Sequence, residues 1–141
     1  MDHDTTSTDE VIAYLSLLQE SVADALRARK ALLSDLLIAR REPENAVARA
    51  GRASRRCVRA FDYALSRISR RRAPPLAGDC VRQLQGWLEA HVEACDLLNR
   101  AAAANDRADY ERALHRITDG ALHALGYNEA RSRLARVLAA A

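Results

Sequence analysis

The sequence predicts an all-α protein, an antiparallel bundle of four long helices followed by a short fifth helix at the C-terminus. Three observations lead to this prediction. Apolar residues recur by threes and fours along most of the chain, no segment alternates polar and apolar residues as a strand would, and the connections between periodic segments are short. A chain of 141 residues has the length of one domain, so we expect residues 1–141 to fold as a single helical bundle.

The first helix is expected to begin at Ser7 and to end near Arg41. The four residues from Ser7 to Glu10 match a capping box, and the polar residues 1–6 before them are expected to be disordered. Arg29 interrupts the apolar stripe, so its stem should pack while its head reaches water. Two sets within the stripe repeat every eleven residues, which favours a straight or slightly right-handed helix. The apolar positions are Val11, Leu15, Leu18, Val22, Leu26, Leu33 and Leu37.

A second helix is predicted from Pro43 to about Arg71. Proline suits a first helical turn because the amide hydrogen that it lacks would be unpaired there. Residues 73–78 then hold two prolines and a glycine and form the one clear linker. The buried seam of this helix should consist of Val47, Ala50, Ser54, Cys57, Phe61, Ala64 and Ile68.

Two further helices are predicted, one capped by Asp79 and the next by Asp106. The residues Gly126-Tyr127-Asn128 predict a break before a short last helix that contains Leu134 and Leu138. The third helix should bury Val81, Leu84, Leu88, His91, Cys95 and Leu98, and the fourth should bury Tyr110, Leu114, Ile117, Ala121 and Leu125.

The composition favours a cytoplasmic protein without a cofactor. The first ten residues are polar and acidic, unlike a secretion signal, and the most apolar stretch, residues 31–39, is far too short to cross a bilayer. Three cysteines, Cys57, Cys80 and Cys95, lack paired metal-type spacing, so we expect neither a disulfide framework nor a bound metal. No phosphate-binding loop or nucleophile elbow is present, which favours a non-enzymatic role.

Positive charge is concentrated in one segment. The chain has a formal net charge of +3, but residues 40–72 carry eleven arginines against three acids, whereas residues 1–39 carry three bases against seven acids. All basic residues except Lys30 are arginine, which fits either a compositional bias or a need for bidentate guanidinium contacts.

On a helical wheel, the arginines of the second helix fall within about 120°, opposite its apolar seam. A basic face that includes an aromatic residue can neutralise phosphates and stack a base. The sequence therefore predicts an interaction module that binds an acidic partner, with RNA, DNA and an acidic protein as candidates. Two alternatives are that the face is simply solvated, or that acids of the first helix pair with it. The predicted binding residues are Arg49, Arg52, Arg55, Arg56, Arg59, Tyr63, Arg67 and Arg70.

Histidines suggest two other kinds of site. His91 and Cys95 lie one turn apart, but two ligands fall short of a metal site, so His91 is predicted to be a core residue. Arg116 and His123 are separated by six residues and resemble the Arg-x4-6-His motif of HEPN ribonucleases, in which Arg and His from two subunits surround a scissile phosphate. This resemblance implies an alternative function as a ribonuclease that uses Arg116 and His123. A second alternative is an assembly protein that acts as a homodimer or larger homo-oligomer, because long apolar stripes favour self-association.

Overall fold

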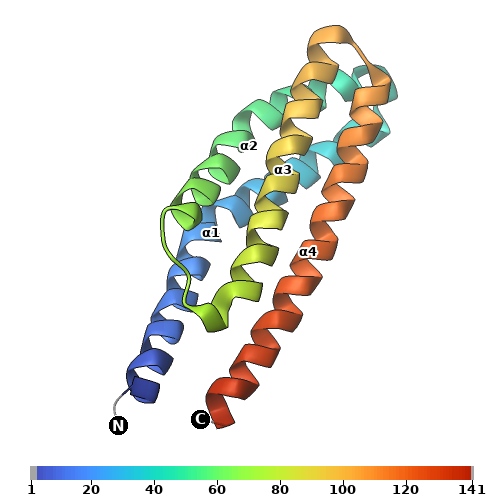
Figure 1. The fold of residues 1–141 in the computed structure, drawn as a ribbon. Helices are drawn as coiled ribbons and strands as arrows, with labels where there is room; N and C mark the ends of the chain where they lie inside the picture. Colours follow the sequence, from blue (N-terminus) through green and yellow to red (C-terminus); the bar gives the residue numbers. More distant parts are fainter. Residues whose placement is uncertain (1–2, 141) are drawn as a thin grey trace.

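The computed structural model describes residues 3–140, and they form four long helices that run alternately up and down (Figure 1). The helices are α1 (His3–Arg41), α2 (Ala46–Ser69), α3 (Gly78–Ala104) and α4 (Arg107–Ala140). Single 3₁₀ turns, η1 (Pro43–Asn45) and η2 (Pro75–Ala77), precede α2 and α3. The described part of the chain contains no strand, so the all-α prediction is confirmed.

The predicted fifth helix is wrong, because α4 continues without interruption from Arg107 to Ala140. Gly126 does not break the helix but leaves room for the end of the Gln83 side chain of α3. A Cβ atom added at Gly126 would lie 2.7 Å from Cδ of Gln83. The absence of a side chain at this position therefore serves helix packing instead of a turn.

Two predicted helix starts also differ from the structure. Helix α1 begins at His3, so Ser7 lies inside the helix, and residues 3–6 are helical although they were expected to be disordered; positions 1 and 2 lie outside the described residues. Neither proline nor glycine stands between His3 and Glu10 to stop the helix earlier. Asp79 lies in the first turn of α3 and not at its cap, since that helix begins at Gly78.

The start of α4 follows the prediction. The Asp106 carboxylate accepts hydrogen bonds from the backbone amides of Ala108 at 2.9 Å and Asp109 at 3.4 Å, as an N-cap should. Asn105 ends α3 in the left-handed conformation, with φ of 49°, which asparagine tolerates better than most residues. These two adjacent residues produce the tight reversal between α3 and α4.

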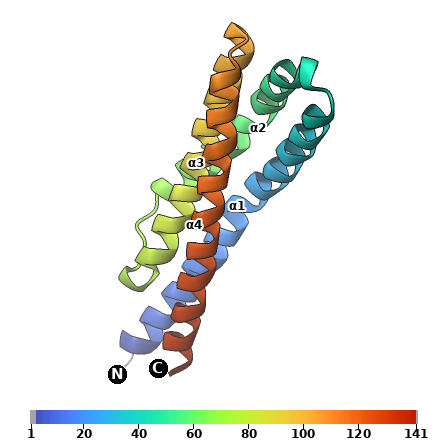
Figure 2. The same cartoon turned by 90° about the vertical axis from the view of Figure 1, so that its right-hand side faces the viewer.

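Packing is sequential: α1 packs on α2, α2 on α3 and α3 on α4. Helices α1 and α4 make almost no backbone contact, and Figure 2 shows them diverging toward the end that carries η1. The predicted seams of α2 and α3 are buried throughout. At the centre, the rings of Phe61, Trp87 and His91 pack together, with centroids 4.6 to 6.2 Å apart. The structure is therefore an open bundle whose two outer helices each have only one close neighbour.

The buried side of α1 differs from the predicted stripe. Its buried positions recur every seven residues, as in a left-handed coiled coil, and not every eleven. Leu26 and Leu37 of the predicted stripe are 55% and 61% exposed, because they face the side on which α4 diverges. The fully buried positions that form the seven-residue repeat are Val11, Leu18, Ala25, Leu32 and Ala39.

Candidate interaction surfaces

The basic face of α2 divides into three parts. The α1 side holds Arg49 and Arg56, which both pair with Asp35 of α1: Nη2 of Arg56 lies 2.9 Å from one carboxylate oxygen, and Nε of Arg49 lies 3.7 Å from the other. Asp35 is only partly exposed. Part of the predicted binding face therefore joins two helices of the protein itself.

On the opposite side, Arg55 is directed to α3, where its Nη1 donates a hydrogen bond of 3.2 Å to Oδ1 of Asn99. This hydrogen bond is exposed, and its acceptor is an uncharged amide. It therefore orients the guanidinium group without cancelling its positive charge. Arg55 lies at the flank of the basic face and not on its crest.

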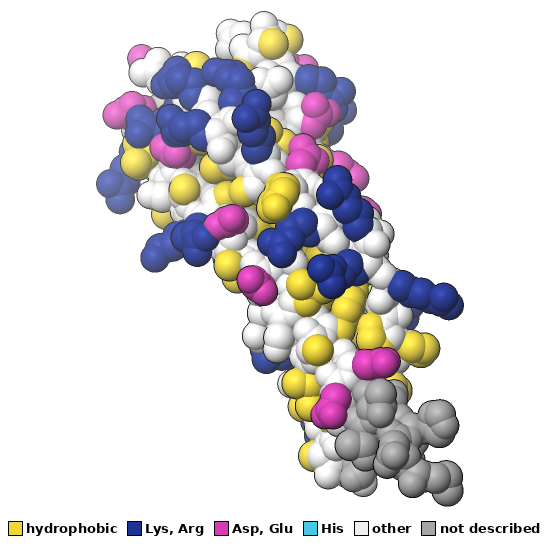
Figure 3. Space-filling model, turned by 90° about the vertical axis from the view of Figure 1, so that its left-hand side faces the viewer, with side chains coloured by type: hydrophobic (Ala, Val, Ile, Leu, Met, Phe, Trp, Pro, Cys, Tyr) yellow, Lys and Arg dark blue, Asp and Glu magenta, His cyan; other side chains and the backbone are white. Residues whose placement is uncertain are grey.

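The crest of α2, together with the C-cap residue Arg70 just after its last turn, carries the remaining five predicted residues, which we call the α2 stripe. Arg52, Arg59 and Arg70 are exposed and have no carboxylate partner in the part of the chain that the structure describes. Tyr63 is 59% exposed, and the guanidinium carbon of Arg67 lies 5.7 Å from the centroid of its ring. Figure 3 shows basic side chains spread over the upper part of this face, with acidic and hydrophobic ones between them. The α2 stripe consists of Arg52, Arg59, Tyr63, Arg67 and Arg70.

Arg116 and His123 lie two turns apart on the side of α4 that faces α3, and each is held there by a structural contact. Arg116 donates to Glu93 of α3 and lies 3.5 Å from Asp119; the bond to Glu93 is the main reason that its pKa is raised. Nδ1 of His123 donates to Oε1 of Gln83 at 2.9 Å. A Cβ atom at Gly86 would lie only 2.5 Å from the His123 ring, so this imidazole fills the space that the glycine leaves between α3 and α4.

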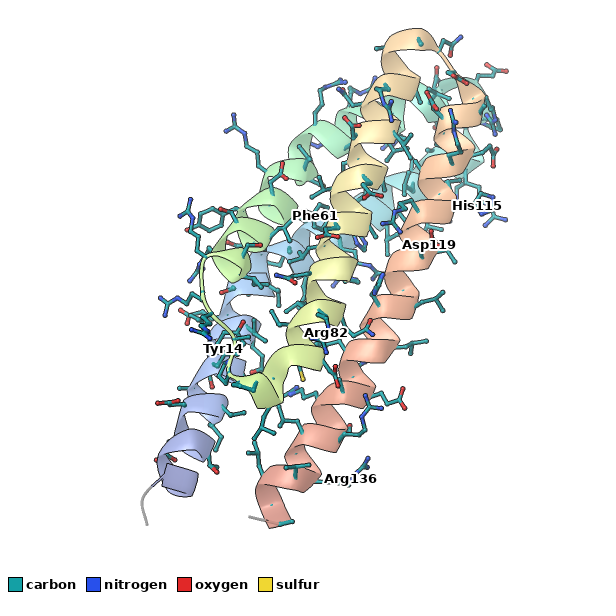
Figure 4. All side chains as sticks on the ribbon, viewed as in Figure 1. Tyr14, Phe61, Arg82, His115, Asp119 and Arg136 are labelled. Atoms are coloured by element: carbon teal, nitrogen blue, oxygen red, sulfur yellow. The ribbon has the colours of Figure 1, made fainter. Side chains whose placement is uncertain are left out.

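His91 is fully buried, as predicted for a core residue. Its Nδ1 donates to the carbonyl oxygen of Trp87 at 2.8 Å, while Nε2 is buried without a partner. Burial lowers the pKa of His91 to about 4, with a smaller contribution from the charge of Arg29, against the opposing effect of the Trp87 bond. The ring is therefore neutral at pH 7, and Figure 4 places Phe61, which packs against it, between α2 and α3.

The three cysteines are buried and unpaired. Burial raises the pKa of all three thiols, that of Cys95 to about 12, so they are protonated at neutral pH and poor nucleophiles. Within residues 3–140, no group of three or more His, Cys, Asp and Glu side chains is placed to hold a metal ion. The same residues include no helix that is long and apolar enough to cross a bilayer.

The sequence reasoning did not foresee an apolar groove between α1 and α4. It contains two hollows of about 560 and 480 Å³, the larger near η1 and the smaller beside Trp87. Below them, α1 and α4 are joined by Gln19, which accepts hydrogen bonds from Arg131 when its amide oxygen faces that guanidinium. Arg29 lies in the smaller hollow with its Nε buried and unpartnered. The interruption of the apolar stripe at Arg29 was the one sequence signal for this groove.

Neither a model of a known protein family, nor a curated protein sequence, nor a solved structure shows a significant match to this chain. Its partners and activity are therefore inferred from its own residues.

Proposed function

We propose that this chain is a non-enzymatic interaction module that binds a nucleic acid strand along the α2 stripe. The observation that carries the proposal is that three arginines on one line lack acidic partners among the described residues, whereas Arg49 and Arg56 on one flank share the carboxylate of Asp35. The partner that this line fits is a chain of phosphates with exposed bases.

The geometry of α2 makes the stripe nearly straight. At 100° per residue, Arg52, Arg59, Tyr63 and Arg70 fall within about 40° of one another, and at 1.5 Å per residue they extend over about 27 Å. Such a line can follow an extended backbone across several phosphates. No enclosed cavity is needed, because the contacts are to the outside of the strand.

The residue types also fit a single strand. Arginine binds phosphate through two parallel hydrogen bonds, and its affinity for nucleic acid comes largely from released counterions. Tyr63 offers one face of its ring to a base while Arg67 lies near the ring. Stacking of this kind accepts any base, so we expect binding with little sequence preference.

The test is fluorescence anisotropy of labelled single-stranded RNA and DNA, repeated over a salt series. A triple variant, Arg52→Glu, Arg59→Glu and Arg70→Glu, should lose most of the affinity. Three lost phosphate contacts should also reduce the log-log salt slope of any remaining binding by about 2, at about 0.7 per phosphate for a single strand. Circular dichroism should stay unchanged, because all three side chains are exposed.

A matched control makes the same change in net charge elsewhere. Arg27→Glu, Arg82→Glu and Arg100→Glu replace exposed arginines of α1 and α3, and their ion pairs are solvent-exposed and weak. The control variant should keep most of its affinity. Equal losses in both variants would show that only net charge matters and would contradict a defined stripe. No binding by the wild type even at low salt would contradict the proposal and point to a protein partner.

The same samples distinguish a binding module from the HEPN-like alternative. A ribonuclease that uses Arg116 and His123 would shorten the RNA, and His123→Ala would stop this shortening. We expect the RNA to stay intact, since both side chains are engaged with α3.

A further inference from the structure

The outer side of α4 carries a regular stripe of exposed residues that no other helix of the chain covers. Figure 2 shows α4 in front of the other helices, with this side free. The stripe advances by fours and threes over 26 residues, about 38 Å of helix, which is the spacing that keeps residues on one side of a helix. Its residues, all exposed, are Glu111, His115, Thr118, Leu122, Leu125, Glu129, Ser132 and Arg136, which we call the α4 stripe.

The middle of the α4 stripe is apolar. Leu122 and Leu125 are 67% and 66% exposed, the highest values among the large hydrophobic residues described. Leu125 also lines the groove between α1 and α4, so the apolar surface continues from the stripe across the groove to Leu26. Contiguous exposed apolar surface of this kind marks an interaction site more often than isolated leucines do.

The α4 stripe is complementary to itself. If two copies of α4 run antiparallel about the midpoint between Leu122 and Leu125, these two leucines face each other across the twofold axis. Thr118 then faces Glu129 of the partner subunit, and His115 faces Ser132 of the partner subunit. At the ends, Glu111 faces Arg136 of the partner subunit. Every position of the stripe thus meets a compatible residue, and each pair occurs twice, as a twofold interface requires.

Neighbouring registers lack this match. A shift of one heptad toward the N-terminus places Glu111 opposite Glu129 of the partner subunit and separates the leucines. A shift toward the C-terminus places Leu125 opposite Glu129 of the partner subunit. Repulsion or a buried charge disfavours both registers, so the sequence specifies a single pairing.

We propose that this protein is a twofold-symmetric homodimer in which the α4 stripes of two copies pair antiparallel, with each α4 along the mouth of the other copy's α1–α4 groove. Leu125 lines the smaller hollow of the groove and Glu111 lines the larger one. The leucine contact and the pairing of Glu111 with Arg136 of the partner subunit therefore both lie at the mouth of the groove.

A second copy explains the surface better than a foreign helix lying in the groove. A helix seated only in the groove would contact Ala121 and Leu125 but not Leu122, which is turned about 60° farther around α4 than Leu125. The self-matching order of charges along the α4 stripe would also have no role. The dimer covers both leucines with one contact, and it leaves the α2 stripe free, because α2 makes almost no contact with α4.

The mass of the protein in solution tests the proposal. Light scattering after size-exclusion chromatography, over a concentration series, should give the mass of two chains. The double variant Leu122→Glu and Leu125→Glu should raise the dissociation constant by roughly a hundredfold or more, because charges would be buried at the axis. Leu76→Glu is the control, since Leu76 is half-exposed and lies in η2, which packs on α1 and α3.

A charge exchange tests the register. Glu111→Arg and Arg136→Glu should each weaken the dimer, by roughly tenfold over the two equivalent pairs, and the two changes combined should restore it. A wild-type protein that is monomeric at every concentration would overturn the proposal, as would an assembly unaffected by the leucine variant. A combined exchange no better than the single ones would overturn the register. These outcomes do not depend on whether the α2 stripe binds nucleic acid.

Discussion

At the scale of single residues, His91 makes the stability of the folded state depend on pH. Its imidazole lies between Phe61 and Trp87 and under Gly120 of α4, where an added Cβ would be 2.9 Å from Cε1. The buried ring has no partner for Nε2, so protonation there would place a charge beside Arg29 without compensation. The folded state thus selects the neutral ring, although an unfolded histidine is half protonated near pH 6.5.

The sign of the resulting pH dependence follows from proton binding. Between about pH 6.5 and 4, the unfolded state holds a proton on residue 91 that the folded state does not, so stability falls as the pH falls. From pH 7 to pH 5, this group should lower the free energy of unfolding by roughly 2 kcal/mol. His91→Asn removes the titration while keeping an N–H donor for the Trp87 carbonyl.

Chemical denaturation at the two pH values tests this expectation. The His91→Asn variant should be less stable at both, because ring packing is lost, but its stability should change less with pH than that of the wild type. An equal pH dependence in His91→Asn and the wild type would mean that residue 91 is not the group that titrates.

At the scale of helices, α2 and α3 approach each other closely at Gly51. A Cβ atom there would lie 2.3 Å from Cβ of Ala102, which is rigid and cannot move aside. Gly51→Ala should therefore separate the helices and destabilise the fold by about 1–3 kcal/mol, although alanine favours a helix more than glycine does. Thermal unfolding followed by circular dichroism measures the loss.

Two further variants check the cause. Gly78→Ala meets only the flexible end of Arg82 at 3.3 Å, so its stability should change by no more than about 0.5 kcal/mol. Ala102→Gly removes the methyl group that Gly51→Ala would strike, so the double variant should recover part of the loss. Additive effects in the double variant would show that the two residues do not meet.

The seams of α2 and α3 were predictable because each helix packs on two neighbours, so every apolar position at helical spacing finds a partner. The outer helices are different. In α1, the sequence offers an eleven-residue and a seven-residue repeat, and only packing against α2 selects the second one. Gly126 likewise looks like a helix break until Gln83 is placed against it.

The basic face of α2 was predictable as a set of residues but not as a surface. Spacing alone places Arg49 and Arg56 beside Arg52, yet only the position of α1 brings Asp35 to the first two. The groove could not be predicted, because it depends on the divergence of α1 from α4. The spacing of residues along one helix shows which of them share a side of that helix. The angle between two helices depends on how the whole bundle packs.

At the scale of the whole molecule, the order of packing divides the helices into two classes. Helices α2 and α3 each have two close neighbours, whereas α1 and α4 have one each and border the groove. The α2 stripe and the α4 stripe lie on helices that hardly touch, so binding of a nucleic acid and pairing of two copies can occur together. A dimer would then offer two α2 stripes to one strand.

This division predicts how the amides exchange with deuterium, measured by mass spectrometry. In dilute protein, α1 and α4 should exchange faster than α2 and α3, because an outer helix can open without unfolding the rest. As the protein concentration rises, protection from exchange should increase in peptides that cover Thr118 to Glu129, because an α4 paired with a second copy can no longer open on its own. Exchange in α2 peptides should stay unchanged. The Leu122→Glu and Leu125→Glu variant should lose this dependence on concentration. Equal protection of all four helices in dilute protein would mean that the open bundle unfolds as one unit.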